Sequence, residues 1–170
     1  MNMKAYNKAI VIILLALAGF KTTYGQEVNE NKNLKSSSQI QDLIDSKNYV
    51  FVAQTAIPIG GRAINLTSPY EVRVSGDTVA SDLPYFGRAF VAPINPSDGG
   101  IHFTSTNFNY KVEGRKKGGW DIEILPKDSK DVRQMHLTLS ASGYGTLQVV
   151  SNNRQQISYN GYVKERKGRV

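Results

Sequence analysis

Hydrophobic and polar residues alternate along most of this chain with the period of a β-strand. Tyr70, Val72 and Val74 alternate with the charged residues Glu71 and Arg73. The same alternation recurs in six further segments, at 101–103, 108–112, 120–124, 135–139, 147–149 and 157–163. Because successive side chains of a strand point to opposite faces of a sheet, each segment predicts a strand with one apolar face.

Two segments before the alternating region follow other patterns. Ile40, Leu43 and Ile44 recur at helical spacing after the serines at 36–38, which can cap a helix. Residues 49–56 are apolar on both parities, which is typical of a strand covered on both faces. We therefore predict a helix near residues 37–47 that covers one face of the strand that follows it.

Short links join the predicted strands, for example around Gly76, Gly143 and Asn152. Strands joined by such short links are antiparallel neighbours, so the chain predicts a meander. Eight or nine twisted strands rarely stay flat, and one strongly curved sheet is the simplest arrangement. The predicted fold class is α+β, mainly β: one N-terminal helix packed on a curved antiparallel meander sheet of about eight or nine strands.

Residues 108–112 and 120–124 are expected to form a hairpin across the glycine-rich turn between them. Pairing Val112 with Trp120 keeps the apolar residues of both strands on one face. The same register places Lys111 opposite Asp121 and predicts a cross-strand ion pair worth about 0.5 kcal/mol. Trp120 opens the apolar side of its strand and is expected to be buried.

The first 25 residues have the order of a secretory signal peptide. Lys4 and Lys8 precede an apolar run at 9–20, and small residues lead up to Gly25. The apolar run is short for a membrane span, which takes about 20 residues; a tilted membrane anchor is the alternative. We expect cleavage after Gly25, which leaves Gln26 first and no transmembrane segment. Without cysteine, lipid attachment at a lipobox is excluded.

Composition and charge divide the chain into four parts. These are a signal peptide at 1–25, a flexible polar leader at 26–36, a single β-rich domain at 37–163 and a basic tail at 164–170. Loss of the signal peptide removes three lysines and no acid, so the formal net charge falls from +7 to +4, and the tail supplies +3 of that remainder. The domain itself is nearly neutral. Together with export to the periplasm or the exterior, this argues against nucleic acid as a partner.

The segment Leu83–Phe90, Leu-Pro-Tyr-Phe-Gly-Arg-Ala-Phe, is the most distinctive in the chain. Together with 49–53, 65–70 and 153–155, it resembles an exported bacterial family known only as a domain of unknown function, family 4251. Members of that family carry a Tyr-Phe-Gly signature after a signal peptide or a lipoprotein signal. The resemblance covers roughly residues 38 to 163. It implies an exported protein of a Gram-negative bacterium and brings no activity, substrate or catalytic residue.

Catalytic and metal-binding patterns are sparse. The two histidines, His102 and His136, lie on the polar side of their strands, whereas catalytic zinc usually takes three protein ligands. No Gly-x-Ser-x-Gly motif occurs, which leaves a Ser–His pair formed by folding as the alternative. Asp121 and Glu123 share a face at a spacing that suits paired carboxylates, but the neighbouring Lys111 favours an ordinary charged surface. We therefore predict a non-enzymatic protein without catalytic residues, metal or cofactor.

The turn between 114 and 119 places three cations at a hairpin tip, namely Arg115, Lys116 and Lys117. Charged tips of this kind usually serve solubility. Contact with an anionic lipid or glycan is the alternative.

The first candidate surface is the Tyr-Phe-Gly segment. Tyr85, Phe86 and Phe90 place three aromatic rings within six residues. One interpretation is a structural corner whose rings plug the sheet, with Gly87 in a backbone conformation that other residues resist. The other interpretation is an aromatic surface that binds a ligand, with Arg88 supplying a polar contact.

The second candidate surface is the outward parity of the last strands, which is polar but almost uncharged. It comprises Gln134, His136, Thr138, Thr146, Gln148, Gln156, Ser158, Asn160 and Tyr162. Solvated sheet faces usually carry lysine and glutamate, so this composition suits a glycan or another protein as well as plain solvent. The candidate residues of both surfaces are Tyr85, Phe86, Arg88, Gln134, His136, Gln148, Asn160 and Tyr162.

These patterns lead to one functional hypothesis and two alternatives. The hypothesis is an exported, non-enzymatic binding or structural domain of the bacterial cell envelope, whose partner is a glycan, a lipid or a protein. One alternative is an envelope hydrolase with an unrecognised site. The other is a module that docks on another protein or inhibits it.

Overall fold

The computed structural model describes residues 37–91 and 99–166. All of them belong to one compact unit, Asn33–Val170, whereas a second unit, Met1–Lys32, lies outside the described residues. The predicted signal peptide, the leader with the first capping serine, and positions 167–170 of the basic tail are therefore outside the description. Among the described residues, no helix is long and apolar enough to cross a membrane.

The described chain forms one helix at 37–45 and nine strands. The strands are β1 Asn48–Pro58, β2 Ile64–Ser75, β3 Thr78–Leu83, β4 Ile101–Ser105, β5 Phe108–Gly114, β6 Trp120–Pro126, β7 Val132–Leu139, β8 Tyr144–Ser151 and β9 Ile157–Glu165. The helix ends two residues before its predicted limit because Lys47 takes a φ of 49°, the left-handed conformation that commonly terminates helices.

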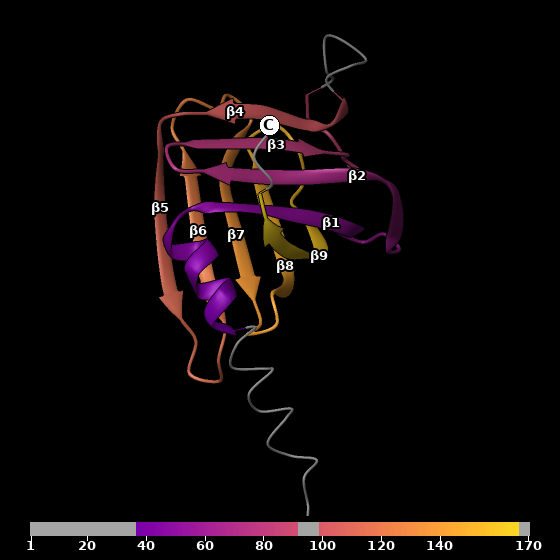
Figure 1. Cartoon of the computed structure of the whole chain (residues 1–170). Helices are drawn as coiled ribbons and strands as arrows, with labels where there is room; N and C mark the ends of the chain where they lie inside the picture. The colour runs from indigo at the N-terminus through magenta and orange to yellow at the C-terminus, as the bar shows by residue number, and fades with distance from the viewer. Residues whose placement is uncertain (1–36, 92–98, 167–170) are drawn as a thin grey trace, which may run out of the picture. The chain divides into compact units, whose positions relative to one another are not determined.

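All nine strands belong to one antiparallel sheet in the order β4-β3-β2-β1-β9-β8-β7-β6-β5. Two meanders, β1–β4 and β5–β9, are joined by the pairing of the first strand with the last. In Figure 1, β1–β4 run across the direction of β5–β7. The two edge strands, β4 and β5, follow one another in the chain, so the curved sheet is nearly closed. The predicted fold class, helix and strand number are confirmed.

The interior is built from the apolar parity of every strand, as the alternation predicted. The largest fully buried side chains include Tyr49, Phe51, Leu83, Ile122, Met135, Leu147 and Tyr159. The helix adds Ile40 and Ile44 to the same cluster. Trp120 is 7% exposed, which confirms its predicted burial. Its indole nitrogen donates to Gln41 Oε1 at 2.5 Å, and this bond ties the helix to β6.

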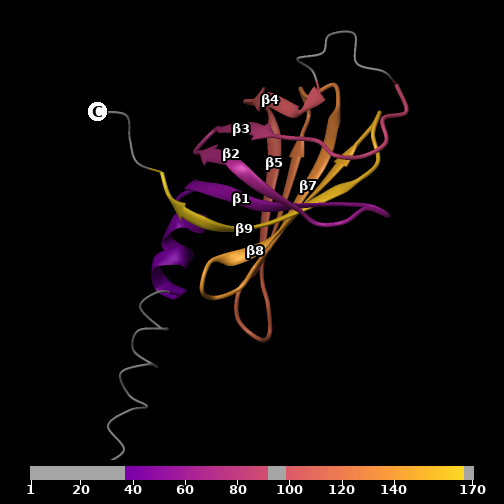
Figure 2. The same ribbon diagram turned by 90° about the vertical axis from the view of Figure 1, so that its right-hand side faces the viewer.

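The β9 strand lies between β8 and β1, pairs with both, and bends along its length (Figure 2). The pairing of β1 with β9 and with β2 changes register between Ala53 and Thr55, which marks a bulge. Gly161 pairs with Ala53 at this point, and a Cβ on Gly161 would lie 2.0 Å from the Val52 carbonyl oxygen. Glycine therefore allows the two backbones to approach at the bend.

The predicted register of the β5–β6 hairpin is wrong by two residues. Gly114 lies opposite Trp120, so Lys111 faces Glu123 and not Asp121. Gly118 and Gly119 both have positive φ, which closes a tighter turn than the one expected. Because the shift is an even number of residues, the apolar faces stay as predicted. The expected ion pair is replaced by Lys111 Nζ–Glu113 Oε1 at 2.6 Å and Arg115 Nε–Asp121 Oδ2 at 3.5 Å.

Candidate functional site

The Tyr-Phe-Gly segment is bonded to the loop between β8 and β9. Tyr85 Oη donates to the carbonyl oxygens of Arg88, at 2.9 Å, and Gln155, at 3.0 Å. The buried Tyr159 donates its hydroxyl to the Pro84 carbonyl at 2.6 Å. Tyr85 and Phe86 are half-buried and pack against the core. These bonds and contacts favour the structural interpretation of the two rings.

Gly87 is needed for a different reason from the one that the sequence suggested. Its φ is not positive, so its backbone conformation is open to other residues. A Cβ at this position would instead lie 2.7 Å from Tyr85 Oη and 2.9 Å from Tyr85 Cζ. The glycine therefore leaves room for the Tyr85 hydroxyl to reach its two carbonyl partners.

Arg154 is a structural residue that the sequence analysis missed. Its Nη1 donates to the carbonyls of Gly100, at 2.8 Å, and Gly99, at 3.2 Å, and its Nε lies 3.2 Å from Asp131 Oδ2. The guanidinium also stacks 5.3 Å from the centre of the Tyr85 ring. Burial raises the pKa of Tyr85, so its hydroxyl remains a donor at neutral pH. No local pattern marks Arg154, because its partners lie far away in the sequence.

Arg88 is exposed, as predicted. We expect Arg88→Ala to change the free energy of unfolding by no more than about 0.5 kcal/mol. Tyr85→Phe should cost about 1–2 kcal/mol, because two carbonyls lose their donor. Urea denaturation of both variants tests this. An Arg88→Ala loss as large as that of Tyr85→Phe would show that Arg88 holds the segment in place.

The second candidate surface lies on three neighbouring strands. His136 pairs with Gln148 across β7 and β8, and Gln148 pairs with Ser158 across β8 and β9. The strand parity then places Gln134, His136, Gln148, Asn160 and Tyr162 on one face. Tyr85, Phe86 and Arg88 do not join them, because their segment is bonded to Tyr159, which points to the opposite side of β9. The eight candidate residues thus form two separate groups.

The sequence analysis missed one member of this face, Tyr144. It lies opposite Tyr162 across β8 and β9, and the two ring centres are 5.9 Å apart with an interplanar angle of 52°. Tyr144 is 61% exposed, which is unusual for a large apolar ring. Its parity matches Thr146 and Gln148, so the alternation could have identified it. We call Tyr144, Tyr162, Thr146, Gln148 and Asn160 the tyrosine face.

The uncharged composition ends at β6. Asp121 and Glu123 share this side of the sheet and are bonded to β7: Thr138 donates to Asp121 at 2.8 Å, and Gln134 donates to Glu123 at 2.7 Å. His136 Nε2 lies 3.7 Å from Asp121 Oδ1. The five residues Lys111, Glu113, Asp121, Glu123 and His136 line a hollow of about 150 Å³. Pairing with Glu113 raises the pKa of Lys111, so its charge is retained.

His102 is far from this hollow along the sheet. Its Nδ1 lies 2.9 Å from Asp82 Oδ1, opposite it across β3 and β4. Within residues 37–91 and 99–166, no three histidine, aspartate or glutamate side chains are grouped so that they could hold a metal ion.

Comparison with known proteins places the chain by fold and by family. A crystal structure of a DUF4251 family protein from Bacteroides eggerthii DSM 20697 is similar, with a TM-score of 0.57 and 17% identity over 76% of this chain and 87% of that one. At this identity the likeness shows the fold. No curated protein matches the sequence. The model of the family described as "Domain of unknown function (DUF4251)" matches residues 31–163, and the chain belongs to that family, which confirms the resemblance.

Proposed function

We propose that this protein is an exported, non-catalytic binding domain of the bacterial cell envelope, and that the tyrosine face binds a glycan. The observation that carries the proposal is the exposed Tyr144 ring beside Tyr162, bordered by amide and hydroxyl side chains. Tyr144 is exposed and lies against the half-buried Tyr162 on an otherwise polar sheet face, and aromatic residues are enriched at contact surfaces.

The chemistry of the tyrosine face matches that of a sugar chain. A tyrosine ring offers an apolar face with a polar hydroxyl at its tip, which suits the C–H face and the hydroxyls of a pyranose. Asn160 and Gln148 each carry a donor and an acceptor, and sugar hydroxyls need both. Thr146 Oγ1 donates to Asn160 Oδ1 at 2.8 Å, which fixes the orientation of the amide.

Export is supported by the charged start and the short apolar run before Gly25. The related structure is that of a protein from Bacteroides eggerthii, a bacterium. A cysteine-free domain held by packing does not depend on the redox state of its compartment. An envelope glycan is then a ligand that the exported domain would meet.

The test is binding of the purified protein to bacterial envelope polysaccharides, namely sedimented peptidoglycan and soluble capsular or lipopolysaccharide glycans. Tyr144→Ala should weaken binding at least about tenfold, because an exposed aromatic anchor contributes strongly to such contacts. Phe90→Ala is the matched control, since Phe90 is 63% exposed and lies on the Tyr-Phe-Gly segment. If the Tyr144→Ala variant bound the glycans as tightly as the unsubstituted protein, the proposal would be contradicted. If only the Phe90→Ala variant lost glycan binding, the site would lie on the Tyr-Phe-Gly segment.

The hydrolase alternative has its best candidate in the hollow that contains Asp121, Glu123 and His136. Both carboxylates already accept hydrogen bonds from β7, and Arg115 lies near Asp121. This arrangement favours a charged surface network over an acid–base pair. Release of sugar fragments in the same binding assay, abolished by Glu123→Gln, would overturn the non-catalytic part of the proposal.

A further inference from the structure

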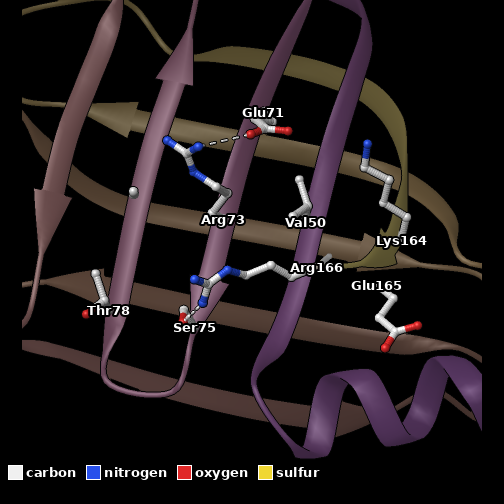
Figure 3. Close-up of a pocket in the computed structure, with 9 residues that line it drawn as sticks. Val50, Glu71, Arg73, Ser75, Thr78, Lys164, Glu165 and Arg166 are labelled. Atoms are coloured by element: carbon white, nitrogen blue, oxygen red, sulfur yellow. Dashed lines mark hydrogen bonds and ion pairs between the residues drawn. The ribbon is translucent and has the colours of Figure 1, made fainter. Parts of the chain in front are cut away.

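A second surface, over β1–β3 and the end of β9, has the charge that the tyrosine face lacks. A groove of about 870 Å³ runs over the outer side of β1, β2, β3 and the end of β9. Its lining includes three cations, Arg73, Lys164 and Arg166, together with Val50 and Ser75. Figure 3 shows these side chains around the same stretch of sheet. We call this set the cationic groove.

Strand register explains why the cations converge. Val50 lies at the centre, opposite Arg73 on one side and Lys164 on the other. Neighbouring strands are about 4.8 Å apart, so the Cα atoms of these two cations are separated by about 10 Å on one face. Arg166 extends from the end of β9 over β1 and donates to Ser75 Oγ on β2 (Figure 3). Three positively charged side chains thus surround the apolar side chain of Val50 at the base of the groove.

Val50 is only 4% exposed although it is on the outer face of the sheet. Arg73, Lys164 and Arg166 line the groove together with Val50, and Figure 3 shows their side chains around it. Long basic side chains bury apolar surface with their stems and keep their charged ends in water. The charged ends are therefore held at the rim of the groove, where they can meet a ligand.

The groove also contains two carboxylates. Glu71 Oε1 lies 3.3 Å from Arg73 Nη1, which uses one guanidinium nitrogen and leaves the other N–H groups of Arg73 available. Glu165 has the opposite parity to Lys164 on β9, and in Figure 3 its side chain points toward the helix and away from Arg73. In Figure 3 the Glu71 carboxylate lies between Arg73 and Lys164 and offsets part of the positive charge there. With three cations and two carboxylates in its lining, the groove keeps a formal net charge of +1.

We propose that the cationic groove binds the phosphate group of a phosphate-bearing ligand. Guanidinium groups match tetrahedral oxyanions with paired N–H donors, and lysine adds a mobile point charge. Arg73 and Arg166 supply the first kind of contact and Lys164 the second. The phosphate comes from a soluble phosphorylated molecule or from the headgroup of an anionic lipid. The proposal shares no residue with the tyrosine face and stands independently of glycan binding.

The experiment has two arms that separate these sources. Isothermal titration with inorganic phosphate and with inorganic pyrophosphate tests the soluble source. Co-sedimentation with phosphatidylcholine vesicles, with and without phosphatidylglycerol, tests the lipid source. Binding in the first arm supports a soluble phosphate, and binding only to vesicles with phosphatidylglycerol supports a headgroup. Absence of binding in both arms at low and physiological salt overturns the proposal.

The variants test the location of the site. Arg73→Gln combined with Lys164→Gln should weaken binding at least about tenfold, because two charge-assisted contacts are lost. The matched control is Lys116→Gln combined with Lys117→Gln, which removes the same charge from the exposed β5–β6 turn. The thermal midpoint should stay unchanged in both, since the altered charges are at the surface. Equal weakening in the control pair would show non-specific attraction and overturn the proposal.

Discussion

Trp120→Ala is expected to lower the free energy of unfolding by about 3–5 kcal/mol, the range for deletion of a large buried aromatic side chain. Trp120 is 7% exposed and belongs to the same cluster as Ile40 and Ile44. Its removal would leave a cavity between the helix and β6 and would remove the hydrogen bond that the indole donates to Gln41 of the helix. Urea denaturation followed by far-ultraviolet circular dichroism measures the loss.

Gln41→Ala separates the two contributions of the indole. It removes the hydrogen bond to Trp120 and keeps the ring, so it should cost about 1 kcal/mol. A loss for Trp120→Ala below about 1 kcal/mol would show that the ring does not support the core.

Gly161→Ala is expected to cost about 2–3 kcal/mol even though it adds a single methyl group. The new Cβ would lie 2.0 Å from the Val52 carbonyl oxygen and 3.0 Å from Phe51 Cζ. The backbone oxygen cannot rotate away as a side chain can, so β1 and β9 would have to separate. These strands join the two meanders, and their pairing is therefore essential to the nearly closed sheet.

Gly114→Ala is the matched control, because Gly114 is also a strand glycine. A Cβ there would meet nothing within 4 Å. The free energy of unfolding of the Gly114→Ala variant should stay within about 0.5 kcal/mol of that of the unsubstituted protein. If both alanine variants had the same stability, the close approach at Gly161 would not be a constraint on the sheet.

Several features of the fold were predictable because they depend on neighbouring residues. Whether a side chain points inward follows from strand parity, so the buried face of each strand and the burial of Trp120 could be predicted. The helix followed from the spacing of Ile40 and Ile44. The register of the β5–β6 hairpin could not be predicted. Val112 can pair with Trp120 or with Ile122, and both choices keep every apolar residue on the same face.

The candidate surfaces were predictable only in part. Parity grouped Gln148, Asn160 and Tyr162 correctly on one face, but Tyr144, next to the turn around Gly143, was not among the candidates. The structural role of Tyr85 could not be derived, because Gln155 is 70 positions away. Residues of the cationic groove were not candidates at all, since Lys164 and Arg166 were interpreted as a solvated tail.

The amino-acid sequence by itself determined the elements of this protein: one amphipathic helix, about eight or nine strands and the apolar face of each. Only the tertiary structure decided that β1 pairs with β9 and that the run of consecutive neighbours breaks between β4 and β5. The pairing of β1 with β9 joins residues more than a hundred positions apart and places Arg73 and Lys164 on either side of Val50. The physical reason is that side-chain alternation is a local property, whereas backbone hydrogen bonds between strands are chemically alike for every partner. The choice among partner strands therefore depends on how the apolar faces of all the strands are buried together in the curved sheet.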